Sequence, residues 1–200
     1  MADDRWNLNI HYHSIILGVA PAAGVALDVG CGDGLLTFDL AERGLRVTGI
    51  DPDQASIDRA VSDPRSTERS AFVCDDIFSY PFQLGSFDLV AANAMLHHVD
   101  AVAGLRRMKK LVRPGGTIAI VGFARASELA DHGRAIAGAL FKRARQLRGH
   151  GKPWEHNAPI VWPPPLTAAE MAGLAAQELP GSELRPLLSS RYSLTWQAPA

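Results

Sequence analysis

The sequence has little of several features that would assign it to a class of protein at once. It contains only two cysteines, Cys31 and Cys74, so no disulfide framework is expected. No run of about 18 apolar residues is present, which argues against a membrane-spanning helix. The formal net charge is −1, so no strong overall field favours nucleic acid or a membrane surface as a partner.

Other signatures are missing as well. The sequence shows no zinc-ligand spacing, no triad pattern and no pair of catalytic carboxylates, so we expect no metal site. The first residues include Asp3, Asp4 and Arg5 but no basic stretch followed by an apolar one, which favours a cytoplasmic protein without a signal peptide. The length of 200 residues and the apolar content of 47% suit one globular domain spanning residues 1–200.

The strongest positive feature is a group of glycines after a short apolar run. The run Val25 to Val29 predicts a buried strand, and an amphipathic pattern from Leu35 to Glu42 predicts a helix. Between them lie Gly30, Gly32 and Gly34, where glycine permits positive φ and a close approach of a ligand to the backbone. The spacing is G-x-G-x-G and not the dinucleotide fingerprint G-x-G-x-x-G, which favours a smaller ligand.

Acidic and polar side chains follow the next predicted strands, residues 45–50, 71–74 and 87–92. Asp51 follows the first of these, where a carboxylate can accept hydrogen bonds from both hydroxyls of a ribose. Asp75 and Asp76 follow the second, and Asn93 follows the third. The carboxyl ends of strands are where α/β sheets bind ligands, so these residues are candidates for one site.

The chain resembles the class I methyltransferases that use S-adenosylmethionine, and more narrowly the small-molecule enzymes of the ubiquinone/menaquinone-biosynthesis type. The resemblance rests on four motifs in order, LDVGCGDG, GID, FDLVAANAMLHHV and LVRPGG, and covers roughly Val25 to Phe123. It implies an α/β, Rossmann-like, seven-stranded and mostly parallel sheet with helices on both faces and a C-terminal antiparallel hairpin. Two short strands so close in sequence must pair antiparallel, because a parallel crossover needs a dozen or more residues.

The resemblance also implies the cofactor, S-adenosyl-L-methionine, and the residues that bind it. Asp28 is expected to hold the glycine loop or the amino end of methionine. Asp76 with Ile77 is the preferred pair for adenine and Asp75 is the second choice, although one of the two aspartates could merely cap the turn. The full expected set of cofactor residues is Asp28, Gly30, Gly32, Gly34, Asp51, Pro52, Asp75, Asp76, Ile77 and Asn93.

His97 and His98 are the candidates for catalysis. An imidazole can remove a proton from the acceptor as the methyl group arrives, and His98 is the preferred base. Alternatively, either histidine packs within the domain or simply lines the pocket. As adjacent residues on a helix they point about 100° apart, which makes them poor common metal ligands.

Two segments outside the common motifs are candidates for contact with the substrate. The N-terminal segment 1–20 is expected to be a helix that covers the bound cofactor, with Tyr12 or His13 closing the site. The insertion 124–165 is expected to be a substrate lid that places Trp154 and His156 at the acceptor. Alternatively, the first is a surface helix and the second packs onto the long helix predicted to end near Arg148.

The expected function is therefore transfer of a methyl group to an O, N or C atom of a small-molecule acceptor. A nicotinamide-dependent oxidoreductase is disfavoured by the glycine spacing. A nucleic-acid methyltransferase is disfavoured by the net charge and by Asn93-Ala-Met-Leu96 standing where such enzymes carry Asn/Asp-Pro-Pro-aromatic. A non-catalytic S-adenosylmethionine-binding or regulatory module stays open, as does the oligomeric state.

Overall fold

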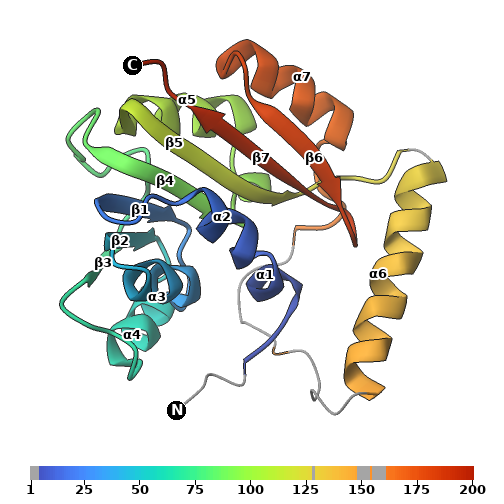
Figure 1. Ribbon diagram of the computed structural model, residues 1–200, viewed down its shortest axis with the longest axis horizontal. Coiled ribbons are helices and arrows are strands. Elements are labelled where there is room, and N and C mark those ends of the chain that lie inside the picture. The colour runs from blue at the N-terminus through green and yellow to red at the C-terminus, as the bar shows by residue number, and fades with distance from the viewer. Residues whose placement is uncertain (1–4, 128, 148–153, 155–160) are drawn as a thin grey trace.

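The computed structural model describes residues 5–127, 129–147, 154 and 161–200. The described strands form one seven-stranded sheet in the order β3-β2-β1-β4-β5-β7-β6 (Figure 1). Their bounds are β1 Val25–Val29, β2 Arg46–Asp51, β3 Ser70–Cys74, β4 Phe87–Asn93, β5 Val112–Phe123, β6 Glu183–Leu187 and β7 Arg191–Gln197. Strands β1 to β5 pair in parallel, whereas β7 runs antiparallel to both β5 and β6. The predicted mostly parallel sheet with its C-terminal antiparallel hairpin is confirmed.

Helices connect the strands and cover the sheet. They are α1 Leu8–His11, α2 His13–Val19, α3 Leu35–Glu42, α4 Gln54–Ser62, the 3-10 helix η1 Leu96–His98, α5 Ala101–Leu111, α6 Leu129–Leu147 and α7 Ala168–Glu178. In Figure 1, α5 and α7 lie on one side of the sheet and α1, α2 and α3 on the other. None of the helices in the described part of the chain is long and apolar enough to cross a membrane.

The two faces of the sheet are buried by alternating residues of the same strands. In β4, Val90 packs into the core under α5 and α7, whereas Leu89 and Ala91 pack into the core under α1 to α3. Successive side chains of a strand point to opposite faces, so a strand covered on both sides must be apolar throughout. The continuous apolar runs that predicted these strands follow from this double burial.

Capping residues set several helix boundaries. The carboxylates of Asp53 and Asp100 accept hydrogen bonds from the Ser56 and Ala103 amides and begin α4 and α5. Before α7, Thr167 and Glu170 form the reciprocal capping box that their spacing in the sequence predicts.

The N-terminal segment differs from the single helix that its pattern predicts. Two short helices meet at Tyr12, and Asn7 caps the first by accepting a hydrogen bond of 2.9 Å from the Ile10 amide. The Tyr12 hydroxyl accepts a hydrogen bond of 3.1 Å from the Leu188 amide, which ties this segment to the distant hairpin. The break between the two helices thus coincides with a tertiary contact, which the periodicity of a single segment cannot reveal.

At the amino ends of the strands, Asp88 joins three segments. It accepts hydrogen bonds from the Val25 amide at 2.7 Å and from Arg113 Nε at 2.6 Å. The strand pairing shifts here between Phe87 and Leu89, so β5 begins earlier than the turn at residues 113–116 suggests. Asp88 therefore has a structural role at the amino ends of the strands, opposite the polar strand ends.

Candidate cofactor and acceptor site

A cavity of about 350 Å³ opens at the carboxyl ends of β1, β2, β3 and β4. It falls at the point where the strand order reverses, which is the usual place for a ligand in an open α/β sheet. Of the expected cofactor residues, nine line this cavity: Asp28, Gly30, Gly32, Asp51, Pro52, Asp75, Asp76, Ile77 and Asn93. The structure thus brings together side chains that the sequence spreads over more than 60 positions, from 28 to 93.

The three glycines of the loop differ in what they do. Gly32 has φ +50°, and a Cβ built on it would meet no atom within 4 Å, so its backbone faces open space in the cavity. Gly34 has φ +78° and lies outside the cavity lining, where a Cβ would come within 2.8 Å of the Phe72 ring. Gly34 therefore permits close packing at the start of α3, and the structure does not place it against a ligand.

Asp51 is held in place by the backbone on both of its oxygens. Its Oδ2 accepts a hydrogen bond of 2.9 Å from the Gly32 amide, and its Oδ1 accepts one of 2.9 Å from the Asp53 amide. Each carboxylate oxygen has capacity for a further hydrogen bond. The carboxylate is thus oriented at the cavity before any ligand arrives.

Asp75 and Asp76 both cap the turn after β3 and both line the cavity. Asp75 Oδ1 accepts hydrogen bonds from the Asp76 amide at 2.6 Å and from Ser79 Oγ at 2.7 Å. Asp76 Oδ1 accepts one of 2.8 Å from the Phe78 amide. The next residue, Ile77, is buried and offers an apolar surface beside these carboxylates.

Asp28 is a buried carboxylate at the base of the cavity. Its Oδ2 accepts a hydrogen bond of 2.8 Å from the Thr37 hydroxyl, and the residue is only 1% exposed. Burial raises the pKa of Asp28 to about 6, although the Thr37 hydrogen bond acts in the opposite direction. A cation placed beside Asp28 would favour its ionised form.

Asn93 presents an unused acceptor. Its side-chain amide donates a hydrogen bond of 3.2 Å to the Asn9 carbonyl, while its Oδ1 is buried and has no partner among the described residues. The following residue, Ala94, has φ +57°, a left-handed conformation that costs a non-glycine residue about 1–2 kcal/mol. This turn separates the end of β4 from η1. A buried orphan acceptor and local strain at a strand end are both features of ligand sites.

The N-terminal segment contributes residues that the sequence did not point to. Asn7, Asn9 and Ile10 line the cavity together with His13, whose Nδ1 lies 2.6 Å from Asp39 Oδ2. Tyr12 is buried and does not line the cavity, so the structure does not place it where the sequence suggested. An asparagine such as Asn7 is a common first residue of a helix, so a helix start could be predicted here, but nothing in the sequence shows that this turn meets the glycine loop.

The two adjacent histidines line different cavities. Their ring centroids are 4.0 Å apart, yet His98 lines the main cavity and His97 lines a second one of about 240 Å³. In a 3-10 helix successive side chains point about 120° apart, which separates them. Burial lowers the pKa of His97 to about 4, with smaller contributions from His98 and Arg191.

The insertion reaches the main cavity through Trp154, whose backbone is fixed to the N-terminal segment. Its amide donates a hydrogen bond of 2.6 Å to the Trp6 carbonyl, and its own carbonyl accepts one of 3.2 Å from Asn7 Nδ2. His156, the other expected substrate residue of this insertion, lies outside the described residues. Among the residues that the structure does describe, no group of three or more His, Cys, Asp or Glu side chains could hold a metal ion.

Comparison with known proteins finds methyltransferases. A family model described as "Methyltransferase domain" matches residues 27–120. An uncharacterized methyltransferase of Mycobacterium tuberculosis is 38% identical over 199 residues, covering 98% of this chain and 99% of the relative. A ubiquinone biosynthesis O-methyltransferase of Methylocella silvestris is 43% identical over 95 residues, covering 45% of this chain and 36% of the relative.

Solved structures share the fold at low sequence identity. An S-adenosylmethionine-dependent methyltransferase of Aquifex aeolicus aligns with a TM-score of 0.65 and 12% identity, covering 95% of this chain and 91% of that one. A phosphoethanolamine N-methyltransferase of Haemonchus contortus, solved with phosphomonomethylethanolamine and S-adenosylhomocysteine, aligns with a TM-score of 0.68 and 17% identity, covering 98% of this chain and 53% of that one.

The sheet order and the acidic cavity at its switch point, together with these matches, define a class I S-adenosylmethionine-dependent methyltransferase. The chain belongs to the methyltransferase domain family. Its similarity to the mycobacterial relative extends over 98% of the chain. The residues present fit the cofactor, because Gly32 leaves open space and Asp51 and Asn93 offer oriented acceptors.

Proposed function

We propose that the protein methylates a small-molecule acceptor, and that the main cavity binds the cofactor through the nine residues that line it. The observation that carries this proposal is the Asp51 carboxylate, which two backbone amides orient at the edge of a 350 Å³ cavity. A preoriented acceptor of this kind suits the two adjacent hydroxyls of a ribose.

The remaining residues match the other parts of the cofactor. Asp76, or alternatively Asp75, accepts from the adenine amino group, and Ile77 packs against the ring. Asn93 Oδ1, which lacks a partner in the described structure, accepts from the amino group of the methionine end. Asp28 stabilises the same positive charge from the base of the cavity, because an opposite charge nearby favours the ionised form of a buried carboxyl.

The cofactor supplies an activated methyl group on a cationic sulfur, so the leaving group needs neither an acid nor a metal. The chain contributes alignment and a water-poor cavity, and positioning of this kind is worth roughly 7–11 kcal/mol. Held by the residues that line the main cavity, the cofactor would supply the methyl group to the acceptor atom, and its sulfur would keep the bonding pair. Where the acceptor is a hydroxyl or an amine, its proton passes to His98, which lines the cavity. His97 is the poorer base because it faces the second cavity and its pKa is lowered.

The segments around the cavity receive roles from their contacts. Residues 1–20 form a cover over the cofactor, to which His13 contributes and Tyr12 does not. Residues 124–165 form the substrate lid, and Trp154 is its described contact with the cavity. Residues 1–200 then make up one domain. Two free cysteines, Cys31 and Cys74, agree with a reducing cytoplasm as the place of action.

Calorimetry with S-adenosylmethionine, S-adenosylhomocysteine and NADH tests the cofactor assignment. We expect the first two to bind and NADH not to bind. A transfer assay with a labelled methyl group then separates an enzyme from a binding module. Binding of NADH in place of the sulfur ligands would refute the proposal, and so would cofactor binding without turnover of any small-molecule acceptor. Salt-dependent RNA binding with methylation of RNA would replace the small-molecule acceptor by a nucleic acid.

A further inference from the structure

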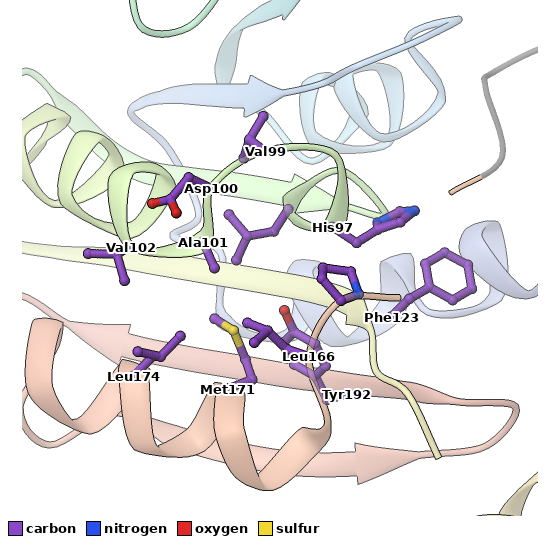
Figure 2. Close-up of a pocket in the computed structure, with 12 residues that line it drawn as sticks. His97, Val99, Asp100, Ala101, Val102, Phe123, Leu166, Met171, Leu174 and Tyr192 are labelled. Carbon is purple, nitrogen blue, oxygen red and sulfur yellow. The ribbon is translucent and has the colours of Figure 1, made fainter. Parts of the chain in front are cut away.

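The first residue of β7, Arg191, lies at the edge of the sheet where the main cavity opens. Strand β7 runs antiparallel to β5, so it begins beside the carboxyl end of that strand, with Arg191 opposite Phe123. The guanidinium carbon of Arg191 lies 4.2 Å from the centre of the Phe123 ring, and Figure 2 shows this ring close to His97. Arg191 is half-buried and does not itself line the main cavity.

The hydrogen-bond partners of the Arg191 guanidinium are neutral. Its Nε and Nη2 both donate to Oδ1 of Asn9, at 3.3 and 2.9 Å, and its Nη1 donates to the Ser189 carbonyl at 3.0 Å. No carboxylate among the described residues forms an ion pair with it. Burial lowers the pKa of Arg191 to about 10, which still leaves it charged at neutral pH. A rigid planar fork with two donors on one acceptor fixes Asn9 in direction as well as in distance.

Asn9 connects Arg191 to the side chain of Asn93. The Asn9 carbonyl accepts a hydrogen bond of 3.2 Å from Asn93 Nδ2. A carbonyl oxygen can only accept, so the Asn93 amide group turns its nitrogen toward Asn9 and its oxygen away. That oxygen, Oδ1, is buried and has no partner among the described residues, and both asparagines line the main cavity. The hydrogen bond to Asn9 thus decides which atom of Asn93 is offered to a ligand.

We propose that Arg191 is a positioning residue for the cofactor, which holds Asn9 in place so that Asn9 keeps Asn93 Oδ1 directed at the amino group of the methionine end. This inference rests on the proposed function, which assigns that amino group to Asn93. If the Asn93 amide turned over, its NH₂ group would face the amino group of the ligand, and two donors cannot pair. Arg191 and Asn9 are 182 positions apart in the sequence, so only the folded chain brings them together.

Two ligands separate the amino-acid end of the cofactor from its adenosine end. S-adenosylhomocysteine carries the amino group, whereas 5′-methylthioadenosine has the same adenosine and sulfur without the amino-acid end. Asn93→Ala should weaken binding of S-adenosylhomocysteine by about 10–10²-fold, because a hydrogen bond to a charged group is lost. It should change binding of 5′-methylthioadenosine little. The ratio of the two dissociation constants therefore measures the contact that Asn93 makes.

Arg191→Met removes every donor of the side chain and keeps an apolar chain against Phe123. Calorimetry should show S-adenosylhomocysteine bound about tenfold more weakly or worse, and 5′-methylthioadenosine bound within about twofold of the unchanged protein. In Asn93→Ala, the further change Arg191→Met should cost nothing, because both residues act on one contact. Arg185→Met, at an exposed position of β6 in the same hairpin, is the matched control and should leave both affinities unchanged.

Variants of Asn9 test whether this residue transmits the effect. Asn9→Ala removes the acceptor of Arg191 and keeps the backbone carbonyl, so it should reproduce the selective loss seen in Arg191→Met. Asn9→Asp keeps an acceptor for Nε and Nη2 of Arg191 and should bind S-adenosylhomocysteine more tightly than Asn9→Ala does. Urea denaturation shows which variants are folded. If Arg191→Met is not folded, the pair of Asn9 variants makes the same test.

A purely structural role for Arg191 predicts a different pattern. A loosened N-terminal segment would weaken both ligands alike, and would do so in Asn93→Ala as well. That result would overturn the proposal, and so would full affinity of Arg191→Met for S-adenosylhomocysteine, or equal affinities of Asn9→Ala and Asn9→Asp. Failure of the proposed function would be visible in the unchanged protein, which would then bind neither ligand.

Discussion

Removal of the Asp51 carboxylate is the most direct test of how the cofactor is held. Each of its oxygens is fixed by one backbone amide, at 2.9 Å in both cases, and each has room to accept one ribose hydroxyl. A hydrogen bond to a charged group contributes about 1.5–3 kcal/mol. Two such bonds correspond to about 3–6 kcal/mol, so Asp51→Ala should weaken S-adenosylhomocysteine binding by about 10²–10⁴-fold.

Calorimetry of the unchanged protein and three variants with two ligands separates this contact from a general disturbance of the loop. Asp51→Asn should lose less affinity than Asp51→Ala, because one of the two acceptor oxygens is kept. It should still lose some affinity, because the new amide group faces the backbone N–H of Gly32 or Asp53. Asp58→Asn, at an exposed position of α4 outside the cavity lining, serves as the matched control. The 2′-deoxy form of S-adenosylhomocysteine keeps one of the two hydroxyls, so the unchanged protein should bind it about 10–10²-fold more weakly than S-adenosylhomocysteine, and Asp51→Ala should weaken its binding by only a further 10–10²-fold or so. Full affinity in Asp51→Ala would refute the ribose assignment.

Three further predictions follow from single contacts. Burial raises the pKa of Asp28 from 3.8 to about 6, so the folded protein holds this proton more tightly than the unfolded chain does. The free energy of unfolding should therefore fall by about 3 kcal/mol as pH rises from 3.8 to 6 and then level off. Urea titrations should show no such fall in Asp28→Asn. His98→Gln should lower kcat by about 10²–10⁴-fold with unchanged cofactor affinity, and an unchanged kcat would mean that positioning alone suffices. Gly122→Ala drives a Cβ into the Tyr192 ring and should cost about 1–3 kcal/mol in urea denaturation, whereas Gly173→Ala, with nothing within 4 Å of its Cβ, should not destabilise the protein by overpacking.

Local sequence was enough to predict the part of the fold that surrounds the glycine loop. The strand Val25–Val29 and the helix Leu35–Glu42 have the bounds that the pattern of apolar residues and glycines predicts. The capping box at Thr167 and the pairing of the last two strands were equally readable. Each of these features depends on residues within about a dozen positions of one another, so that backbone sterics and short-range hydrogen bonds decide them.

That the residues at the strand ends line one cavity was predictable for a related reason. Asp28, Asp51 and Asn93 each stand at the carboxyl end of a parallel strand, and the sheet brings all such ends to one edge. Gly34 shows the limit of that argument. Its positive φ was expected. Whether its missing side chain makes room for a ligand or for Phe72 depends on strand β3, which lies 36 positions or more away in the sequence.

The sequence by itself determined a parallel sheet, a glycine bend and a row of acidic strand ends, because these follow from side-chain alternation and backbone freedom along short stretches. Only the tertiary structure decided which of two adjacent residues lines which cavity. His97 and His98 differ by one position and line two different cavities, and of Tyr12 and His13 only His13 lines the main cavity. One step along a helix turns a side chain by 100–120°, so the packing of distant segments around that helix assigns each residue its role.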